Sequence, residues 1–361
     1  MSPKHKHFTQ LTVTTAEWEH LLAPISEDAP TGESLRYDQT YDQIKEARRY
    51  DEPSLPQGDW KTELKKANWE DARYLCIEAL TTRSKDLQIT AWLMEAWLHL
   101  HGYQGLKEGL RLFISLSEKY WDNLYPPIED GDLDYRLSPL VWLNEKLSTQ
   151  LGHVPITAPT TNDAELYTFN EREFAWWLDN RSSEEKEAAK AEGKPTRSQF
   201  LTSATLTPRA FYVHLAADLQ SVIDYTDQLN QLINKYGGEQ APSVGKFRQR
   251  LEDIQNIVKA ILKEKPGETE DDTETIDEEE AVLSSSRAQR KAPIRSRDDA
   301  YRSLAEAAEY LVKTEPHSPT PYLVKRAIKW GNMSLTELLM ELVNNEQDLA
   351  AIYNLLGIKD K

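Results

Sequence analysis

The residues whose types could most readily bind a metal or catalyse a reaction lie in one apolar run, residues 84–106, which reads SKDLQITAWLMEAWLHLHGYQGL. Two histidines, His99 and His101, suggest a metal site, but side chains two positions apart on a helix point about 200° away from each other. The HExxH spacing of helical zinc sites is absent from the sequence. Gln88, Glu95 and His99 instead share one face. We therefore predict a buried helix with a single hydrogen-bonded polar seam, not a catalytic or metal site.

The other candidates for chemistry each have a simpler structural interpretation. Cys76 lies on the apolar face of its predicted helix with no base nearby in the sequence, so we predict a packed thiol. The acidic run 268–280 lacks the spacing and the central glycine of an EF-hand. We therefore predict no catalytic, cofactor-binding or metal-ligating residue. An enzyme with a dispersed site, for instance at Glu33, His99 or His317, stays open as an alternative.

Composition narrows the class of partner. The 361-residue chain carries a formal net charge of −17, with 39% hydrophobic and 29% charged residues, which is typical of a soluble globular protein. Nucleic acids and anionic membrane surfaces need a basic face, so we predict neither as a partner. The single cysteine fits a reducing compartment, and no signal-peptide pattern or apolar run of about 18 residues is found. We predict a cytoplasmic protein with no direct membrane insertion.

The spacing of apolar residues is helical almost throughout, so we predict an all-α fold. An N-terminal helical domain is followed by an irregular charged connection, a middle helical hairpin, a flexible acidic linker and a small oligomerising C-terminal helical domain. The linker is predicted from its like charges and its lack of residues to bury. Whether the middle hairpin packs on the first domain or dimerises is left open. The predicted boundaries are, in that order, 1–150, 151–206, 207–263, 264–292 and 293–361.

Two helix starts are predicted from capping residues. Ser84 is expected to cap the helix of the opening run, with Asp86 in its first turn and Gly102 at its end. Ser138 is expected to cap a later helix, with Pro139 at the first helical position.

The loop TGESLRYD, residues 31–38, precedes the helix predicted over 38–50. Gly32 is expected where a turn needs positive φ, and Asp38 is expected to cap the following helix. We prefer this structural interpretation, while Gly32, Glu33 and Arg36 are retained as a weaker hypothesis of a partner-contacting loop.

The last segment, about 70 residues, is apolar for its size. Small domains bury only a modest fraction of their surface, and burial at roughly 25 cal/mol per Å² favours hiding the surplus against another copy of the chain. The predicted oligomerisation surface consists of Tyr322, Leu323, Ile328, Trp330, Leu335, Leu338, Leu339, Leu342, Ile352 and Leu355.

Three long blocks stand out when the chain is taken as a whole. The first is PISEDAPTGESLRYDQTYDQIKEAR (24–48). The second is SKDLQITAWLMEAWLHLHGYQGLKEGLRL (84–112) with YWDNLYPPIEDGD (120–132). The third is EPHSPTPYLVKRAIKWGNMSLTELLMEL (315–342). Together they resemble the TssA family of type VI secretion systems, the first two its ImpA-type N-terminal domain and the third the C-terminal domain of its VasJ-like members.

The resemblance implies a cytoplasmic scaffold without cofactors. Its C-terminal domain is expected to assemble a ring-like homo-oligomer of dodecamer-like size, with the N-terminal domains projecting as arms. The partners that the resemblance implies are baseplate, tube, spike, sheath and membrane-complex proteins. A generic helical adaptor that recruits a cytoplasmic client is the main alternative, although no fixed 30–45-residue repeat is visible in the sequence.

Overall fold

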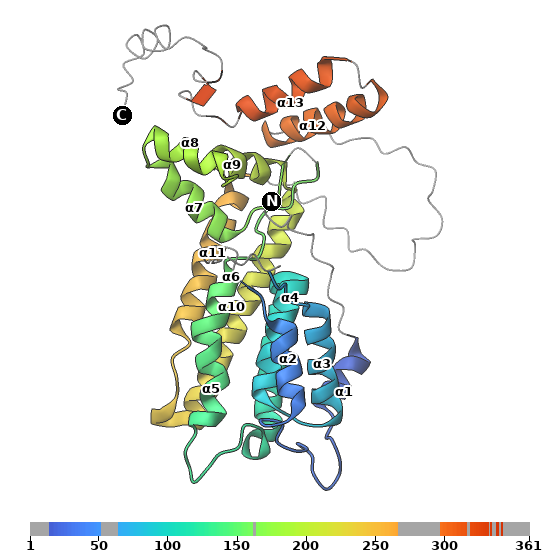
Figure 1. Cartoon of the computed structure of the whole chain (residues 1–361), viewed down its shortest axis with the longest axis vertical. Helices are drawn as coiled ribbons and strands as arrows, with labels where there is room; N and C mark the ends of the chain where they lie inside the picture. The colour runs from blue at the N-terminus through green and yellow to red at the C-terminus, as the bar shows by residue number, and fades with distance from the viewer. Residues whose placement is uncertain are drawn as a thin grey trace.

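The computed structural model describes residues 14–51, 64–161, 164–265, 297–315 and 318–331, together with positions 333, 337, 338 and 341. These residues form an elongated stack of helices (Figure 1), and within them only isolated β-bridges join loop segments. The prediction of an all-α fold is confirmed. The helices are α1 (Thr15–Leu22), α2 (Gln39–Arg48), α3 (Trp69–Thr82), α4 (Leu87–Tyr120), α5 (Asp134–Trp142), α6 (Ser148–Leu151), α7 (Phe169–Asp179), α8 (Ser183–Ala191), α9 (Arg197–Leu206), α10 (Arg209–Gly237), α11 (Gly245–Glu264), α12 (Arg297–Thr314) and α13 (Thr320–Gly331).

The opening run forms the first half of α4, the most buried helix of the chain's first half. Every residue from 89 to 98 is buried, and a helix that is apolar on all sides needs neighbours on all sides. Helices α2 and α3 cover one side and α10 another, while α1 packs against α3 and α4. The buried side chains of this cluster include Ile44, Cys76, Leu80, Leu87, Ile89, Leu93, Trp97 and Leu98.

A glycine kink divides α4 where the sequence predicts a helix end. Gly102 has a φ of 64°, a left-handed conformation that favours glycine. Beyond the kink the chain passes close to the preceding turn, since a Cβ on Gly105 would lie 2.2 Å from the carbonyl oxygen of Trp97. The predicted stop at Gly102 is confirmed, and the next helix continues from it almost without a break.

Helices α10 and α11 form the predicted middle hairpin, and they pack on the first part of the chain. α10 lies along α4, and α11 packs on α10 and on the π-helical turn Leu143–Leu147. Lys107 of α4 pairs with Asp218 of α10 at 3.0 Å. Within the chain, the hairpin therefore packs on the first domain, with α10 against α4.

Both predicted caps need correction. Asp86, not Ser84, caps α4, because its Oδ1 accepts from the backbone amides of Gln88 and Ile89 at 2.7 and 3.2 Å. Pro139 lies inside α5 and not at its start. A proline leaves the carbonyl four residues earlier without its helical donor, and here the hydroxyl of Ser138 donates to the carbonyl of Tyr135 at 2.8 Å. The helix therefore runs through the proline.

The stretch expected to be an irregular charged connection contains α7, α8 and α9. Helix α8 has no buried residue. It is held by a capping box between Ser182 and Glu185 and by residues with high helix propensity, chiefly Glu, Lys and Ala. Helix α8 is solvated as expected, but the prediction of irregular structure is wrong, and α7 and α9 bury residues such as Phe169 and Phe200.

The tail helices α12 and α13 pack on each other and touch α9. Leu206 at the end of α9 forms a small buried cluster with Ala305 and Ile328. Nearby, the Nζ atom of Lys265 lies 3.4 Å from Oδ2 of Asp298. The predicted linker, 264–292, lies outside the described residues apart from its first two positions. Within the described residues, no helix is both long enough and apolar enough to cross a membrane.

Candidate partner-binding loop and tail surface

The loop before α2 is fixed against the segment that joins α3 to α4. The amide of Glu33 donates to the carbonyl of Arg83 at 3.1 Å, and the amide of Lys85 donates to the carbonyl of Thr31 at 2.9 Å. Gly32 between them has a φ of 71°, and a Cβ there would lie 1.9 Å from the Arg83 carbonyl oxygen. The prediction that Gly32 occupies a positive-φ turn is confirmed.

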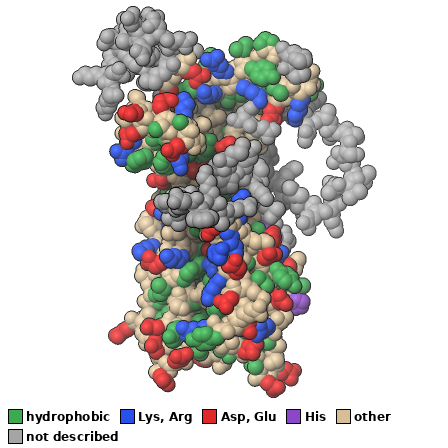
Figure 2. All heavy atoms as spheres, viewed as in Figure 1, with side chains coloured by type: hydrophobic (Ala, Val, Ile, Leu, Met, Phe, Trp, Pro, Cys, Tyr) green, Lys and Arg blue, Asp and Glu red, His purple; other side chains and the backbone are tan. Residues whose placement is uncertain are grey.

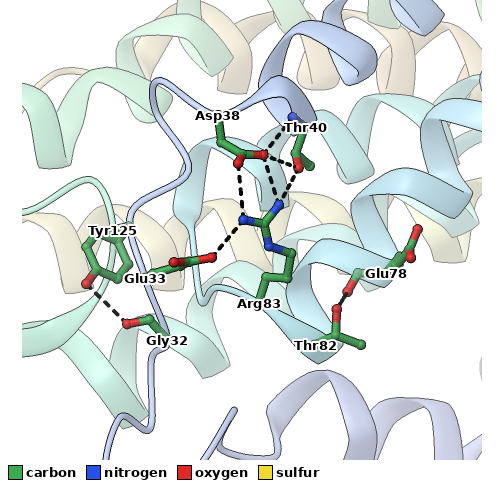
Figure 3. Close-up of polar contacts among 8 residues, drawn as sticks. All are labelled: Gly32, Glu33, Asp38, Thr40, Glu78, Thr82, Arg83 and Tyr125. Atoms are coloured by element: carbon green, nitrogen blue, oxygen red, sulfur yellow. Dashed lines mark hydrogen bonds and ion pairs between the residues drawn. The ribbon is translucent and has the colours of Figure 1, made fainter.

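Arg83 binds the two ends of this loop (Figure 3). Its guanidinium reaches Asp38 at 2.9 and 3.2 Å and Glu33 at 2.7 Å. Asp38 also accepts from the backbone amide of Thr40 at 2.8 Å, which confirms it as the cap of α2. The hydrogen bonds from Arg83, and then those from Thr40, hold the pKa of the Asp38 carboxyl well below its usual range. Glu33 of the predicted partner loop is therefore paired within the chain.

Arg36, the third residue of the predicted partner loop, faces outward among aromatic rings. Its guanidinium carbon lies 3.9 Å from the ring centroid of Tyr135 and 5.5 Å from that of Tyr37. Tyr37 is 93% exposed. Aromatic and arginine side chains together are the residue types that dominate protein-binding surfaces.

A cavity of about 500 Å³ opens beside these two residues. The hydroxyl of Tyr41 is turned inward and donates to Oδ2 of Asp86 at 2.7 Å, so its ring forms part of the cavity wall. The ring of Trp92 meets Tyr41 edge-on at 4.8 Å. The residues that line the cavity are Arg36, Tyr37, Tyr41, Asp42, Lys45, Gln88 and Trp92.

Sequence reasoning did not identify most of this wall. Part of the signal was present, because Tyr41 and Lys45 are four residues apart within α2, the spacing of one helical face. The contribution of Trp92 has no such signal, since it comes from α4 and meets α2 only through tertiary packing.

The polar seam of α4 is hydrogen-bonded only in part. Oε2 of Glu95 accepts from Nε of Arg48 at 2.5 Å. His99 stacks on Trp69 with ring centroids 4.0 Å apart. Within the described part of the chain, the amide nitrogen of Gln88 and Nε2 of His99 have no hydrogen-bond partner. The predicted hydrogen-bonded seam is therefore present at Glu95, while one nitrogen each of Gln88 and His99 lacks a partner.

Burial governs the titration of this seam. It raises the pKa of Glu95 against the opposing effect of Arg48. Burial lowers the pKa of His99 to about 3, so the ring is neutral at pH 7. Burial likewise raises the pKa of the Cys76 thiol, which is fully enclosed.

Two of the three residues named for a dispersed enzyme site, Glu33 and His99, have separate structural partners. Glu33 pairs with Arg83 and His99 stacks on Trp69, while His317 lies outside the described residues. Over the ranges that the structure describes, no group of three or more His, Cys, Asp and Glu side chains is placed to hold a metal ion.

The tail helices expose large apolar side chains (Figure 2). Tyr322 and Leu323 of α13 are 54% and 62% exposed, and Leu304 and Tyr310 of α12 are also exposed. Ile328 is instead buried in the cluster with Leu206.

The other residues predicted for oligomerisation divide into two groups. Trp330 and Leu338 are half-buried, and Nε1 of Trp330 donates to Glu341 at 3.2 Å. The remaining five positions lie outside the described residues: Leu335, Leu339, Leu342, Ile352 and Leu355.

Comparisons with known proteins agree with this architecture. Residues 22–145 match the family model described as ImpA, N-terminal, type VI secretion system. The solved N-terminal domain, including the conserved ImpA_N region, of the TssA component from Burkholderia cenocepacia is 30% identical in sequence and superposes with a TM-score of 0.61. The match covers 73% of this chain and 98% of that domain. The chain belongs to the TssA family.

A relative of known name extends the TssA assignment into the tail. The type VI secretion system component TssA1 of Pseudomonas aeruginosa is 26% identical over 339 residues, which cover 90% of this chain and 94% of the relative. TssA1 and the Burkholderia cenocepacia protein are both components of type VI secretion systems, and this chain therefore has a role in such a system.

Proposed function

We propose that this TssA-family protein is a cytoplasmic assembly scaffold and not an enzyme. Copies of the chain form a ring-like homo-oligomer through their tails and prime baseplate and tail tube/sheath assembly. The observation that carries the proposal is the exposure of Tyr322 and Leu323 on α13 and of Leu304 and Tyr310 on α12, the two helices that pack on each other. Large apolar side chains gathered on one helix pair mark an interaction surface in a soluble protein.

The proposed mechanism is multivalent binding, with no bond made or broken. A ring presents many N-terminal halves at once, which turns weak contacts with each partner into strong overall binding. The partners are baseplate, tube, spike, sheath and membrane-complex proteins, and neither nucleic acid nor a lipid bilayer is among them. The loop that carries Arg36 is the proposed contact region of each N-terminal half, because Gly32 and Glu33 hold it in one conformation.

The test is the mass of the full-length particle, measured by light scattering or mass photometry. The double variant Tyr322→Ser/Leu323→Ser should shift the particle toward monomer, because it removes exposed apolar surface without touching the cluster around Ile328. Val141→Ser on α5 is the matched control, since it changes an exposed apolar residue on a helix at the end of the molecule opposite α12 and α13 (Figure 1). A full-length protein that remains a monomer at high concentration would contradict the proposed ring.

A further inference from the structure

We propose that the cavity between α2 and α4 binds an acidic peptide segment of a partner protein. A carboxylate side chain of that segment lies between Arg36 and Lys45, and a neighbouring apolar side chain packs on exposed Tyr37 and on the small accessible edges of Tyr41 and Trp92. The inference rests on the proposed scaffold function, because it names the chemistry of the partner that the N-terminal half contacts.

The charge of the cavity rim is the first argument. Arg36 and Lys45 both line the cavity, in a chain whose formal net charge is −17. Within the described residues, the Arg36 guanidinium packs on aromatic rings without an ion pair to a carboxylate. Lys45 lies 3.8 Å from Asp42 in an exposed pair, which is weak in water. Glu129 also attracts Arg36 but does not line the cavity. The lining itself carries two cations and one carboxylate, which makes it complementary to an acidic ligand.

The second argument is an unpaired donor. Gln88 lines the cavity, and within the described residues its amide nitrogen is buried without a hydrogen-bond acceptor. A buried donor without a partner costs roughly 1–3 kcal/mol. A peptide carbonyl or carboxylate in the cavity supplies the missing acceptor once the Gln88 amide turns toward it, because the nitrogen has almost no accessible surface where it lies.

The third argument is the rigidity of the apolar wall. Tyr41 is held by its hydroxyl, which donates to the buried cap of α4. Trp92 is covered by the guanidinium of Arg48, whose carbon lies 4.9 Å from the ring centroid and which is itself paired with Glu95. A wall fixed before binding loses little conformational entropy when a ligand arrives.

Fluorescence anisotropy with the full-length protein tests this assignment. The probe is a short capped, labelled peptide in which Asp and Glu alternate with Leu and Phe. The control peptide carries Lys at every acidic position. We expect the acidic peptide to bind, the basic peptide not to bind, and Arg36→Ala/Lys45→Ala to weaken binding by about tenfold or more. Asp42→Asn should strengthen binding, because it removes the one carboxylate on the rim.

The control variant is Arg181→Ala, since Arg181 is also an exposed cation over an aromatic ring, 4.3 Å from the centroid of Trp177. It should leave binding unchanged. Equal binding of both peptides, or equal loss in Arg181→Ala and Arg36→Ala/Lys45→Ala, would overturn the assignment. Particle mass is measured on the same samples. A ring that persists while acidic-peptide binding is absent refutes the cavity alone, whereas a monomer that still binds the peptide refutes the ring alone.

Discussion

The hydroxyl of Tyr41 on α2 lies 2.7 Å from Oδ2 of Asp86, the residue that caps α4. The carboxylate of Asp86 therefore caps the N-terminus of α4 and, through Tyr41, also holds α2 against α4. Burial raises the pKa of Asp86, although hydrogen bonds from Tyr41 and from two backbone amides oppose this change. The same contact orients the Tyr41 ring toward the cavity, so the stability of the domain and the shape of the proposed binding site depend on one hydrogen bond.

Replacing Tyr41 by Phe should lower the free energy of unfolding by about 1–2 kcal/mol, because the buried carboxylate loses one donor. Asp86→Ala should cost more, since it also removes the cap of α4. Urea denaturation followed by circular dichroism measures both. Tyr74→Phe is the control, because Tyr74 is an exposed residue of α3. The same change in stability for Tyr41→Phe and Tyr74→Phe would contradict the role of the Asp86 contact.

The helices could be predicted well from the sequence, because apolar periodicity and the residues that start and stop helices are local features. Gly102 stops a helix through its own φ, and Asp38 caps α2 through its own side chain. Ser84 and Pro139 were misassigned because each position offers two plausible local solutions. Tertiary packing decides between them: Ser84 is drawn into a bridge with Gly32, and the freed carbonyl at Tyr135 finds a hydroxyl.

The candidate site could be predicted only in part. Gly32, Glu33 and Arg36 were recognisable because they share one turn-rich loop. The cavity that Arg36 borders also needs Trp92, which is distant in sequence, and no local pattern brings it to α2. On the tail, composition indicated surplus apolar residues but could not separate exposed Leu323 from buried Ile328, since that depends on where α9 lies.

Gly32→Ala should destabilise the protein more than Gly193→Ala. The two glycines have nearly the same φ, 71° and 72°, so both substitutions pay the cost of a left-handed conformation, about 1–2 kcal/mol. Only at Gly32 does the new Cβ also meet a backbone oxygen, whereas nothing lies within 4 Å at Gly193. We expect a further loss of about 2 kcal/mol for Gly32→Ala in thermal or urea unfolding. Equal losses would show that the loop moves freely away from Arg83.

Lys85→Met should release α1 from the rest of the domain. The side chain of Lys85 is buried, and its Nζ donates to the carbonyls of Leu21 and Leu80 at 2.8 and 2.6 Å. Burial lowers the pKa of Lys85 to about 8. Each buried carbonyl left without a donor costs about 1–3 kcal/mol.

Hydrogen exchange read by mass spectrometry should show faster exchange in α1 of the Lys85→Met variant, with α10 and α11 unchanged. Lys119→Met is the control, because Lys119 donates to the neighbouring carbonyl of Leu22 at an exposed site. Its effect on α1 should be smaller. If α1 exchanges at the wild-type rate in Lys85→Met, the buried lysine does not hold the helix.

The stability of the protein should fall in acid partly because of His99. Its pKa is about 3 in the folded chain, lowered first by burial, against a reference value of 6.5. A base with a depressed folded pKa is neutral in the native state and binds a proton on unfolding. The titration of His99 therefore has no effect on the free energy of unfolding above about pH 6.5. Below that pH, it lowers the free energy of unfolding progressively as the pH falls toward 3.

The expected loss from His99 is about 2–3 kcal/mol between pH 7 and pH 4.5. His99→Phe should remove that part of the pH dependence while keeping a ring against Trp69. His214→Gln, at an exposed position of α10, is the control and should keep the wild-type slope. The test is the urea midpoint measured across this pH range. If the midpoint changes with pH equally in the wild type and in His99→Phe, other groups cause the whole acid sensitivity.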